Sequence, residues 1–406
     1  MTRSLVRQMI SIRFGCIIRL KSQLAGFFAL LLLGCTPQTQ PDSQQQLMQQ
    51  ATTEPAAAMQ LARQRLAGNE LTDALRWFRQ AASLGDTDGL NHAIQLQQRL
   101  EGRLATAKWL QQQAANEQLN AAAINSEQRA TLGLWRSAPV AVAASGYQAT
   151  TGCNLTIQPV ASQQAGVGRW QYLKAAWAAD GLLSQLPVCF KDLLKVNATE
   201  LNCSEQAGTR IQCDYPVLTD QVVAGDFSQL LIIAGQGVAS YNNGIIQLPD
   251  TASLALLQHE FMHVLGFIDE YPLAKAAAEQ LCQPGNYVAN LLFDNSPATL
   301  AAWRRQWHLP AAAVKLTAVN TCQETGQQAY RVVAKINPME SYQTAMPELY
   351  QQLMVQALTH PENIMPVQYY FAYLARQQQA WQQWHTLMQL AAGHGYDDAV
   401  NALQHL

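Results

Sequence analysis

The chain has 406 residues, of which 49% are hydrophobic and 13% charged, so it can bury a sizeable core in two or three domains. This composition excludes an intrinsically disordered protein. The formal net charge is -2, and no basic patch interleaved with aromatic residues is present, so we expect no nucleic-acid partner.

The N-terminus has the pattern of an export signal. Basic residues precede an apolar run over residues 24–33, which is too short to span a bilayer, so residues 1–34 are expected to be a signal peptide. The signal ends in Leu32-Leu33-Gly34-Cys35, which resembles a bacterial lipobox. That resemblance implies lipidation of Cys35 and attachment to the bacterial cell envelope, at the outer membrane facing the periplasm or the exterior. An ordinary secretory signal with an incidental cysteine is the alternative.

The next two segments differ in composition. Residues 35–55 are rich in Gln, Thr, Ser and Pro, which predicts a flexible linker. Residues 56–134 have helical periodicity and contain two related stretches, Ala74–Ala82 and Thr106–Ala114, each with a Trp and a later Ala pair. These stretches resemble Sel1-like tetratricopeptide repeats. The resemblance implies a surface for a protein partner; a helical spacer with core tryptophans is the alternative.

The helical periodicity ends after residue 134, and we place a second domain at residues 152–379. Within this domain, alternating or apolar runs predict strands at Cys153–Val160, Thr209–Cys213, Gln229–Ala234, Gly244–Pro249 and Tyr330–Ile336. Helical spacing predicts helices at Trp170–Leu186, Leu273–Leu281 and Pro297–Trp307. The mixture predicts an α+β domain, and residues 380–406 are expected to form a C-terminal helical hairpin that echoes the N-terminal repeat.

The central motif is His259-Glu260-Phe261-Met262-His263-Val264-Leu265-Gly266-Phe267-Ile268-Asp269, or HExxHxxGxxD. Residues four apart share one face of a helix, so His259 and His263 can bind one metal, and Glu260 lies beside it as a general base. Gly266 tolerates a positive φ and can end the helix, so that Asp269 returns as a third ligand. Three protein ligands with one open position are typical of catalytic zinc.

This motif resembles the metzincin class of zinc peptidases, in particular the snapalysin-like members that use aspartate as third ligand. The resemblance implies a zincin-like catalytic domain, with a mixed sheet and a zinc-binding helix, that binds one catalytic Zn2+ and hydrolyses peptide or protein substrates. It also implies that the strand at Gly244–Leu248 forms the rim of the substrate cleft. The chain is thus predicted to be a surface-anchored zinc endopeptidase. The competing prediction is a lipoprotein interaction module whose zincin domain is inactive.

Several site assignments stay open. Glu270 or Glu279 could replace Asp269 as third ligand. Metzincins have a methionine turn below the metal, and Met365, which leads directly into a helix, is favoured over Met339. Tyr342 is a candidate phenol near the metal.

The cysteines predict disulfide bonds. Setting aside Cys16 in the signal and Cys35 leaves an even set of six cysteines in an oxidising compartment, which suits three disulfides. A bond between Cys203 and Cys213 would close a short loop, and the remaining sequential pairs would be Cys153 with Cys189 and Cys282 with Cys322. The sequence alone does not fix this pairing.

Overall fold

The computed structural model describes residues 43–136, 152–310 and 314–404. The predicted signal peptide and Cys35 lie outside the described residues. Residues from Leu47 onward form one compact unit. It contains helices and a mixed sheet, which confirms α+β content. None of the described helices is both long enough and apolar enough to cross a bilayer.

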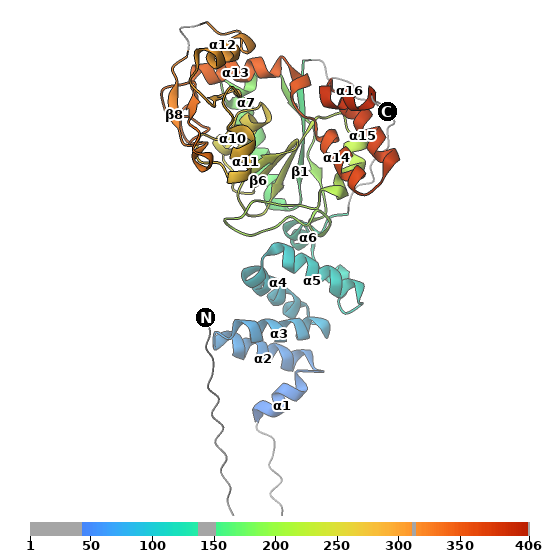
Figure 1. Ribbon diagram of the computed structural model, residues 1–406. Coiled ribbons are helices and arrows are strands. Elements are labelled where there is room, and N and C mark those ends of the chain that lie inside the picture. The colour runs from blue at the N-terminus through green and yellow to red at the C-terminus, as the bar shows by residue number, and fades with distance from the viewer. Residues whose placement is uncertain (1–42, 137–151, 311–313, 405–406) are drawn as a thin grey trace, which may run out of the picture. The chain divides into compact units, whose positions relative to one another are not determined.

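Consecutive helices form the first part of the described chain (Figure 1). They are α1 (Ser43–Gln50), α2 (Pro55–Ala67), α3 (Leu71–Ser83), α4 (Thr87–Glu101), α5 (Arg103–Ala115) and α6 (Ser126–Leu132). The two related stretches fall at equivalent places in α3 and α5, and α2 to α5 each pack against the next helix. Trp77 of α3 is buried in this helical core and Trp109 of α5 packs against it, so both tryptophans help to build the core.

The linker predicted for residues 35–55 is wrong from Ser43 onward. Residues Ser43–Gln50 form helix α1, and Ala51 is fully buried. From Leu47 onward the segment belongs to the packed helices, because Leu47 and Ala51 pack with the first helical core cluster. Residues 35–42 of that prediction lie outside the described part of the chain.

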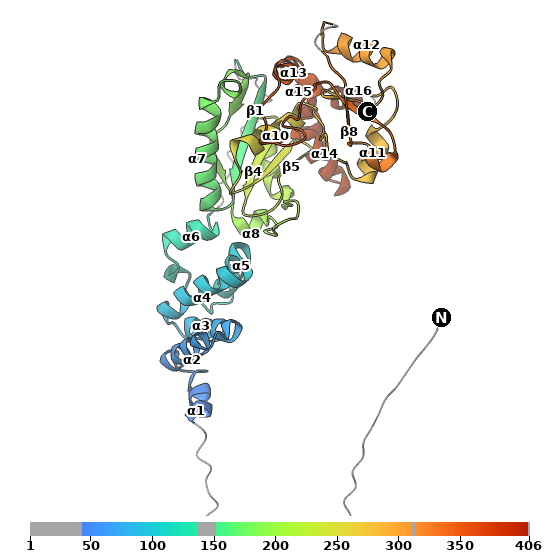
Figure 2. The ribbon, with the colours of Figure 1, turned by 90° about the vertical axis from the view of Figure 1, so that its left-hand side faces the viewer.

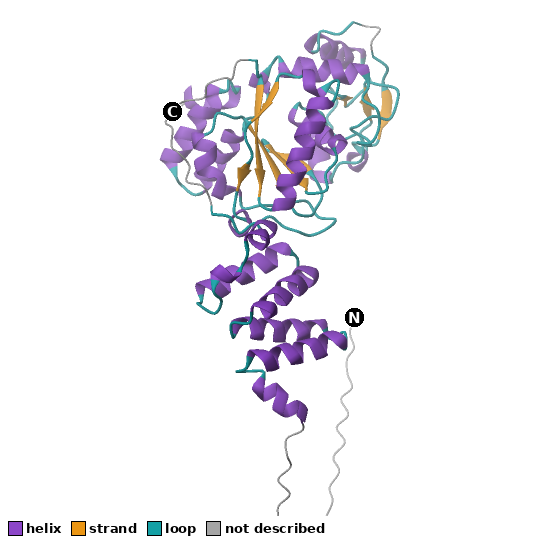
Figure 3. Ribbon diagram, turned by 180° about the vertical axis from the view of Figure 1, so that it is seen from behind, coloured by secondary structure: helices purple, strands orange, loops and turns teal. Residues whose placement is uncertain are grey.

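A mixed sheet forms the centre of the second part (Figure 3). Its strands are β1 (Leu155–Ala161), β2 (Val188–Phe190), β3 (Leu194–Lys195), β4 (Gln229–Ala234), β5 (Ser240–Asn242) and β6 (Ile245–Pro249). Their order is β2-β1-β4-β6-β5, with β3 also paired to β1, and only β5 is antiparallel to its neighbour. The sequence-based rim strand at Gly244–Leu248 is therefore an interior strand, β6, and the edge beside it is β5. A short hairpin turn at Asn243 and Gly244, both with positive φ, joins β5 to β6. The local pattern of such a hairpin does not show which of its two strands lies at the edge of the sheet.

Helices cover both faces of the sheet. Leu231 and Ile233 of β4 pack in a core with α7 (Gln164–Ala179) and α10 (Leu254–Val264), while Leu230 and Ile232 point to the opposite face. That second core is completed by α14 (Val367–Gln377), α15 (Trp381–Gly393) and α16 (Asp397–Gln404). Figure 2 shows α7 and α14 on opposite sides of the strands. The predicted C-terminal hairpin is thus helical through residue 404, and its helices pack in the core on one face of the sheet.

The remaining elements are short helices and strands that connect or flank the main sheet. They are α8 (Ala198–Leu201), α9 (Thr219–Ala224), α11 (Lys275–Leu281), β7 (Leu291–Leu292), α12 (Pro297–Gln306), β8 (Thr317–Val319), β9 (Ala329–Arg331) and α13 (Glu348–Leu358). Strands β7, β9 and β8 form a second, small sheet. The strand predicted at Thr209–Cys213 is wrong: this segment makes only one bridge, between Arg210 and Val238, because the Cys203–Cys213 disulfide closes it into a loop.

Candidate metal centre

Helix α10 places the two motif histidines side by side. It begins at Ser253, whose hydroxyl caps the helix by accepting a hydrogen bond from the Leu256 N–H at 3.1 Å. It ends just before Gly266, which adopts a φ of 82° as the sequence predicts. The chain can therefore turn back and bring Asp269 to the face that carries His259 and His263.

Three ligand atoms converge at this point. The Nε2 atoms of His259 and His263 are 3.3 Å apart. The Oδ1 atom of Asp269 lies 3.4 Å from Nε2 of His259 and 3.3 Å from Nε2 of His263. This group can hold a metal ion. The structure thus brings together the three residues that the motif predicts as ligands.

The outer nitrogens of both imidazoles are already occupied. Nδ1 of His259 donates to the Pro338 carbonyl at 2.8 Å, and Nδ1 of His263 donates to the Phe267 carbonyl at 2.8 Å. In the neutral tautomer that these bonds select, both Nε2 atoms present lone pairs to the same point. Asp269 Oδ1 is buried and accepts no hydrogen bond within the described part of the chain. In that tautomer the two nitrogens and the carboxylate oxygen converge as three acceptors, an arrangement that suits a bound cation.

The charges at the site favour a cation as well. Burial alone would raise the pKa of Asp269, but His259 and His263 outweigh it and hold that pKa well below its usual range. Burial alone would lower the pKa of His263, but Asp269 and Glu260 raise it. Two mostly buried carboxylates therefore lie beside the two histidines, and a positive charge between them would be stabilised.

Glu260 lies next to the ligands as a free base. Its residue surface is only 4% exposed. Burial raises the pKa of its carboxyl group, an effect that His263 and His259 oppose. None of the described residues donates a hydrogen bond to this carboxylate, so it is available to a water molecule or a substrate.

Two tyrosines lie at the rim of the site. The ring of Tyr342 is 6.4 Å from the His259 ring, centre to centre, and the residue is 39% exposed, so the predicted phenol is near the ligands. Tyr271 is also exposed and lies beside Asp269; burial, followed by the charge of Asp269, raises the pKa of its phenol. The sequence analysis assigned no role to Tyr271, although its place two residues after Asp269 was a usable signal.

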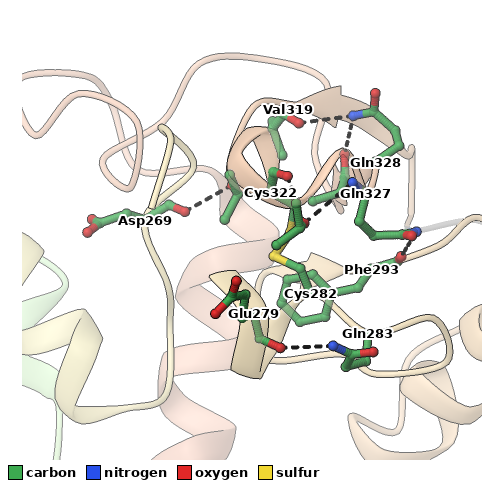
Figure 4. The surroundings of a disulfide bond; sticks show 12 residues. Asp269, Glu279, Cys282, Gln283, Phe293, Val319, Cys322, Gln327 and Gln328 are labelled. Atoms are coloured by element: carbon green, nitrogen blue, oxygen red, sulfur yellow. Dashed lines mark hydrogen bonds between the residues drawn. A yellow bond between two sulfur atoms is a disulfide. The ribbon is translucent and has the colours of Figure 1, made fainter. Parts of the chain in front are cut away.

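Neither alternative third ligand joins the metal group. Glu270 points into a fully buried hydrogen-bond network with Asn290, Asn337 and Tyr350. Burial raises the pKa of its carboxyl group, and these donors oppose that shift. Glu279 is exposed on α11, as Figure 4 shows beside the Cys282–Cys322 disulfide.

Of the two candidate methionine turns, the one with Met339, not the favoured Met365, contacts the residues of the site. Met339 is fully buried in the same core cluster as Phe261 and Met262 of α10, and the carbonyl of the preceding Pro338 holds His259. The Met365 carbonyl instead accepts a hydrogen bond from Gln229, at the start of β4. The sequence offers two Met-containing turns, and only long-range packing distinguishes them.

The predicted disulfides are confirmed in all three pairs: Cys153–Cys189, Cys203–Cys213 and Cys282–Cys322. Figure 4 shows the last of these together with Asp269, to which it is connected through the residue next to Cys322. The hydroxyl of Thr321, adjacent to Cys322, donates to the Asp269 carbonyl at 3.0 Å, and the Thr321 carbonyl accepts from the Leu273 N–H at 3.0 Å. The disulfide therefore fixes the position of Thr321, which holds the Asp269 segment through these two hydrogen bonds.

Removing this disulfide should affect both stability and the site. Cys282 and Cys322 are 40 residues apart, so replacing both by alanine is expected to lower the free energy of unfolding by about 4 kcal/mol. It should also weaken metal binding, because Thr321 is released. The matched control is the Cys153–Cys189 pair, whose separation of 36 residues predicts nearly the same stability loss with unchanged metal affinity. Urea unfolding and competition with a chromophoric chelator measure the two effects; equal metal affinities in both double variants would contradict the link.

A comparison of the chain with models of protein families finds no match, and a comparison with curated proteins finds none either. The interpretation of the site therefore depends on its own geometry. That geometry comprises two imidazoles, one carboxylate and an adjacent second carboxylate on a single helix and its return loop.

Proposed function

We propose that the protein is a zinc-dependent endopeptidase of the metzincin type, with His259, His263 and Asp269 as ligands and Glu260 as general base. The observation that carries the proposal is the spacing of the three ligand atoms, 3.3 to 3.4 Å apart. A tetrahedral zinc ion with ligand distances of about 2.0–2.1 Å requires its ligands to be about 3.3–3.4 Å apart. The donor set of two imidazoles and one carboxylate, with one open position, is also typical of catalytic zinc.

The fold around the site supports the proposal. A mixed sheet with an antiparallel edge strand lies against the helix that carries the motif, as in a zincin domain. The edge strand β5 packs beside α10. An extended peptide that paired with β5 would therefore run along the helix that bears His259 and Glu260.

The chemistry follows from the positions of the side chains. Zinc in this site would supply Lewis acidity to the substrate carbonyl and lower the pKa of a water molecule. Glu260 accepts the proton of that water as its oxygen attacks the carbonyl carbon of the peptide bond. As the C–N bond breaks, Glu260 passes the proton to the leaving amine, which gives a carboxylic acid and an amine as products. Tyr342, on the rim, would donate a hydrogen bond to the carbonyl oxygen.

The envelope location is part of the same proposal. A lipid on Cys35 would hold the catalytic domain at the outer membrane, and the three disulfides are consistent with an oxidising compartment. Helices α2 to α5 would then separate the catalytic domain from the anchor and offer a surface to a protein partner.

Removal of the metal tests the proposal. The protein purified without chelators is expected to contain about one zinc per chain by elemental mass spectrometry and to cleave fluorescence-quenched peptides from a random library. Dialysis against 1,10-phenanthroline should abolish cleavage, and stoichiometric zinc should restore it. Cleavage that persists in protein shown to be free of metal would overturn the proposal.

A further inference from the structure

Glu270, the residue after the third ligand, is the centre of a buried polar network. Its side chain is fully buried. Its carboxylate accepts hydrogen bonds from the Tyr350 hydroxyl at 2.5 Å, from Asn337 Nδ2 at 2.7 Å and from Asn290 Nδ2 at 3.1 Å. Arg331 Nη1 lies 3.4 Å from the same carboxylate. Four donors from four separate parts of the chain thus meet on one side chain.

The network fixes the segment that carries Asp269. Asn290 binds the backbone of Ile268 twice, accepting from its N–H at 2.9 Å and donating to its carbonyl at 2.8 Å. The N–H of Glu270 donates to the Met339 carbonyl at 2.9 Å. The residues before and after Asp269 are therefore held through their backbones, and both of their partners belong to the network around the Glu270 carboxylate.

The same network fixes the turn that orients His259. Asn337, which donates to Glu270, accepts through Oδ1 from the Met339 N–H at 2.9 Å. This closes a tight turn around Pro338, whose carbonyl accepts from His259 Nδ1. One carboxylate therefore connects the support of Asp269 with the support of His259.

We propose that Glu270 is the positioning residue of the metal centre: it sets the distance between Asp269 Oδ1 and His259 Nε2, which are 3.4 Å apart. The inference rests on the metal-binding part of the proposed function and does not depend on peptide cleavage. Tyr350, Asn337 and Asn290 meet at the Glu270 carboxylate, and none of them belongs to the group that can hold a metal. Groups that hold metal ligands in this way commonly tune metal affinity.

The network requires a carboxylate because every partner is a donor. An ionised carboxylate is an acceptor only, whereas a glutamine of the same shape has two N–H donors on one side of its amide. Glu270→Gln would therefore direct an NH2 group at Asn337 and Arg331, or at Tyr350 and Asn290. The turn at Pro338 and the Asp269 segment would have to move apart to relieve this conflict.

The test compares metal affinity with stability. In Glu270→Gln, competition with a chromophoric chelator should show zinc binding weakened by about 10-fold to 100-fold. The visible absorption bands of the cobalt-substituted protein, which report ligand geometry, should shift. The control is Gln368→Leu, which removes a buried hydrogen bond to the Phe227 carbonyl on the opposite face of the sheet. It should lower the stability of the metal-free protein while leaving zinc affinity and the cobalt spectrum unchanged.

The outcomes separate this inference from the proposed function. Zinc affinity and a cobalt spectrum in Glu270→Gln equal to those of the unaltered protein would overturn the positioning role, as would an affinity loss of the same size in Gln368→Leu. If Glu270→Gln does not fold, Tyr350→Phe removes one donor only, and a smaller affinity loss is then expected; no loss would overturn the role. A protein that binds zinc normally but cleaves no peptide would refute the peptidase and leave the role of Glu270 standing.

Discussion

Glu260→Gln is expected to lower kcat for peptide cleavage by about 100-fold to 10,000-fold while the protein still binds its zinc. The carboxylate lies beside the ligands but is not one of them, and it has no hydrogen-bond donor among the residues that the structure describes. Replacing it by an amide therefore removes the proton acceptor without disturbing His259, His263 or Asp269. KM should change little, because the substitution keeps the size of the side chain.

The measurement pairs steady-state kinetics on a quenched peptide with elemental analysis of the same sample. Glu279→Gln is the matched control, since it changes an exposed carboxylate on α11 and should leave both values as they are. A Glu260→Gln protein that retains zinc and keeps full activity would show that another group accepts the proton. A variant that loses its zinc would instead show that Glu260 helps to hold the metal.

His263→Ala is expected to remove nearly all bound zinc and, with it, the stabilisation that zinc gives to the fold. His263 supplies one of the three proposed ligand atoms, and alanine has no side-chain atom that can replace it. With free zinc at about 1,000 times the dissociation constant, zinc stabilises the unaltered protein by about 4 kcal/mol. This difference should vanish in the variant.

Thermal unfolding with and without added zinc measures this effect. In the unaltered protein and in the control His385→Ala, an exposed residue of α15, zinc should raise the unfolding temperature; in His263→Ala it should not. Stabilisation of His263→Ala by zinc to the same degree would place the metal elsewhere in the chain.

The local sequence predicts the ligand helix and its end well. The spacing of His259 and His263 and the positive φ of Gly266 depend on neighbouring residues only, and both appear in the structure. Asp269 joins them because the return loop is short. The strand at Gln229–Ala234 and the helix starting at Pro297 are also found where they were predicted, since both have strong local patterns.

Features that depend on distant residues were predicted wrongly or left open. Met339 and Met365 both lie in turns with a neighbouring proline, and the choice depends on which turn packs below α10. The order of β5 and β6 depends on which of two adjacent hairpin strands pairs with β4. Local pattern contains no information on either choice.

The sequence by itself predicted the ligand set and the general base, because both depend on residue chemistry and on spacing along one helix and its loop, and the structure does bring His259, His263 and Asp269 together. It favoured three disulfide pairs without fixing them, and the structure contains all three. Only the tertiary structure decided what holds the ligands in place. Glu270 looked like a rival ligand in the sequence, yet it turns away from the metal group because Asn290, Asn337 and Tyr350 supply it with buried donors. Those partners lie 20, 67 and 80 residues away along the chain, and a buried carboxylate takes its role from the donors that folding brings to it.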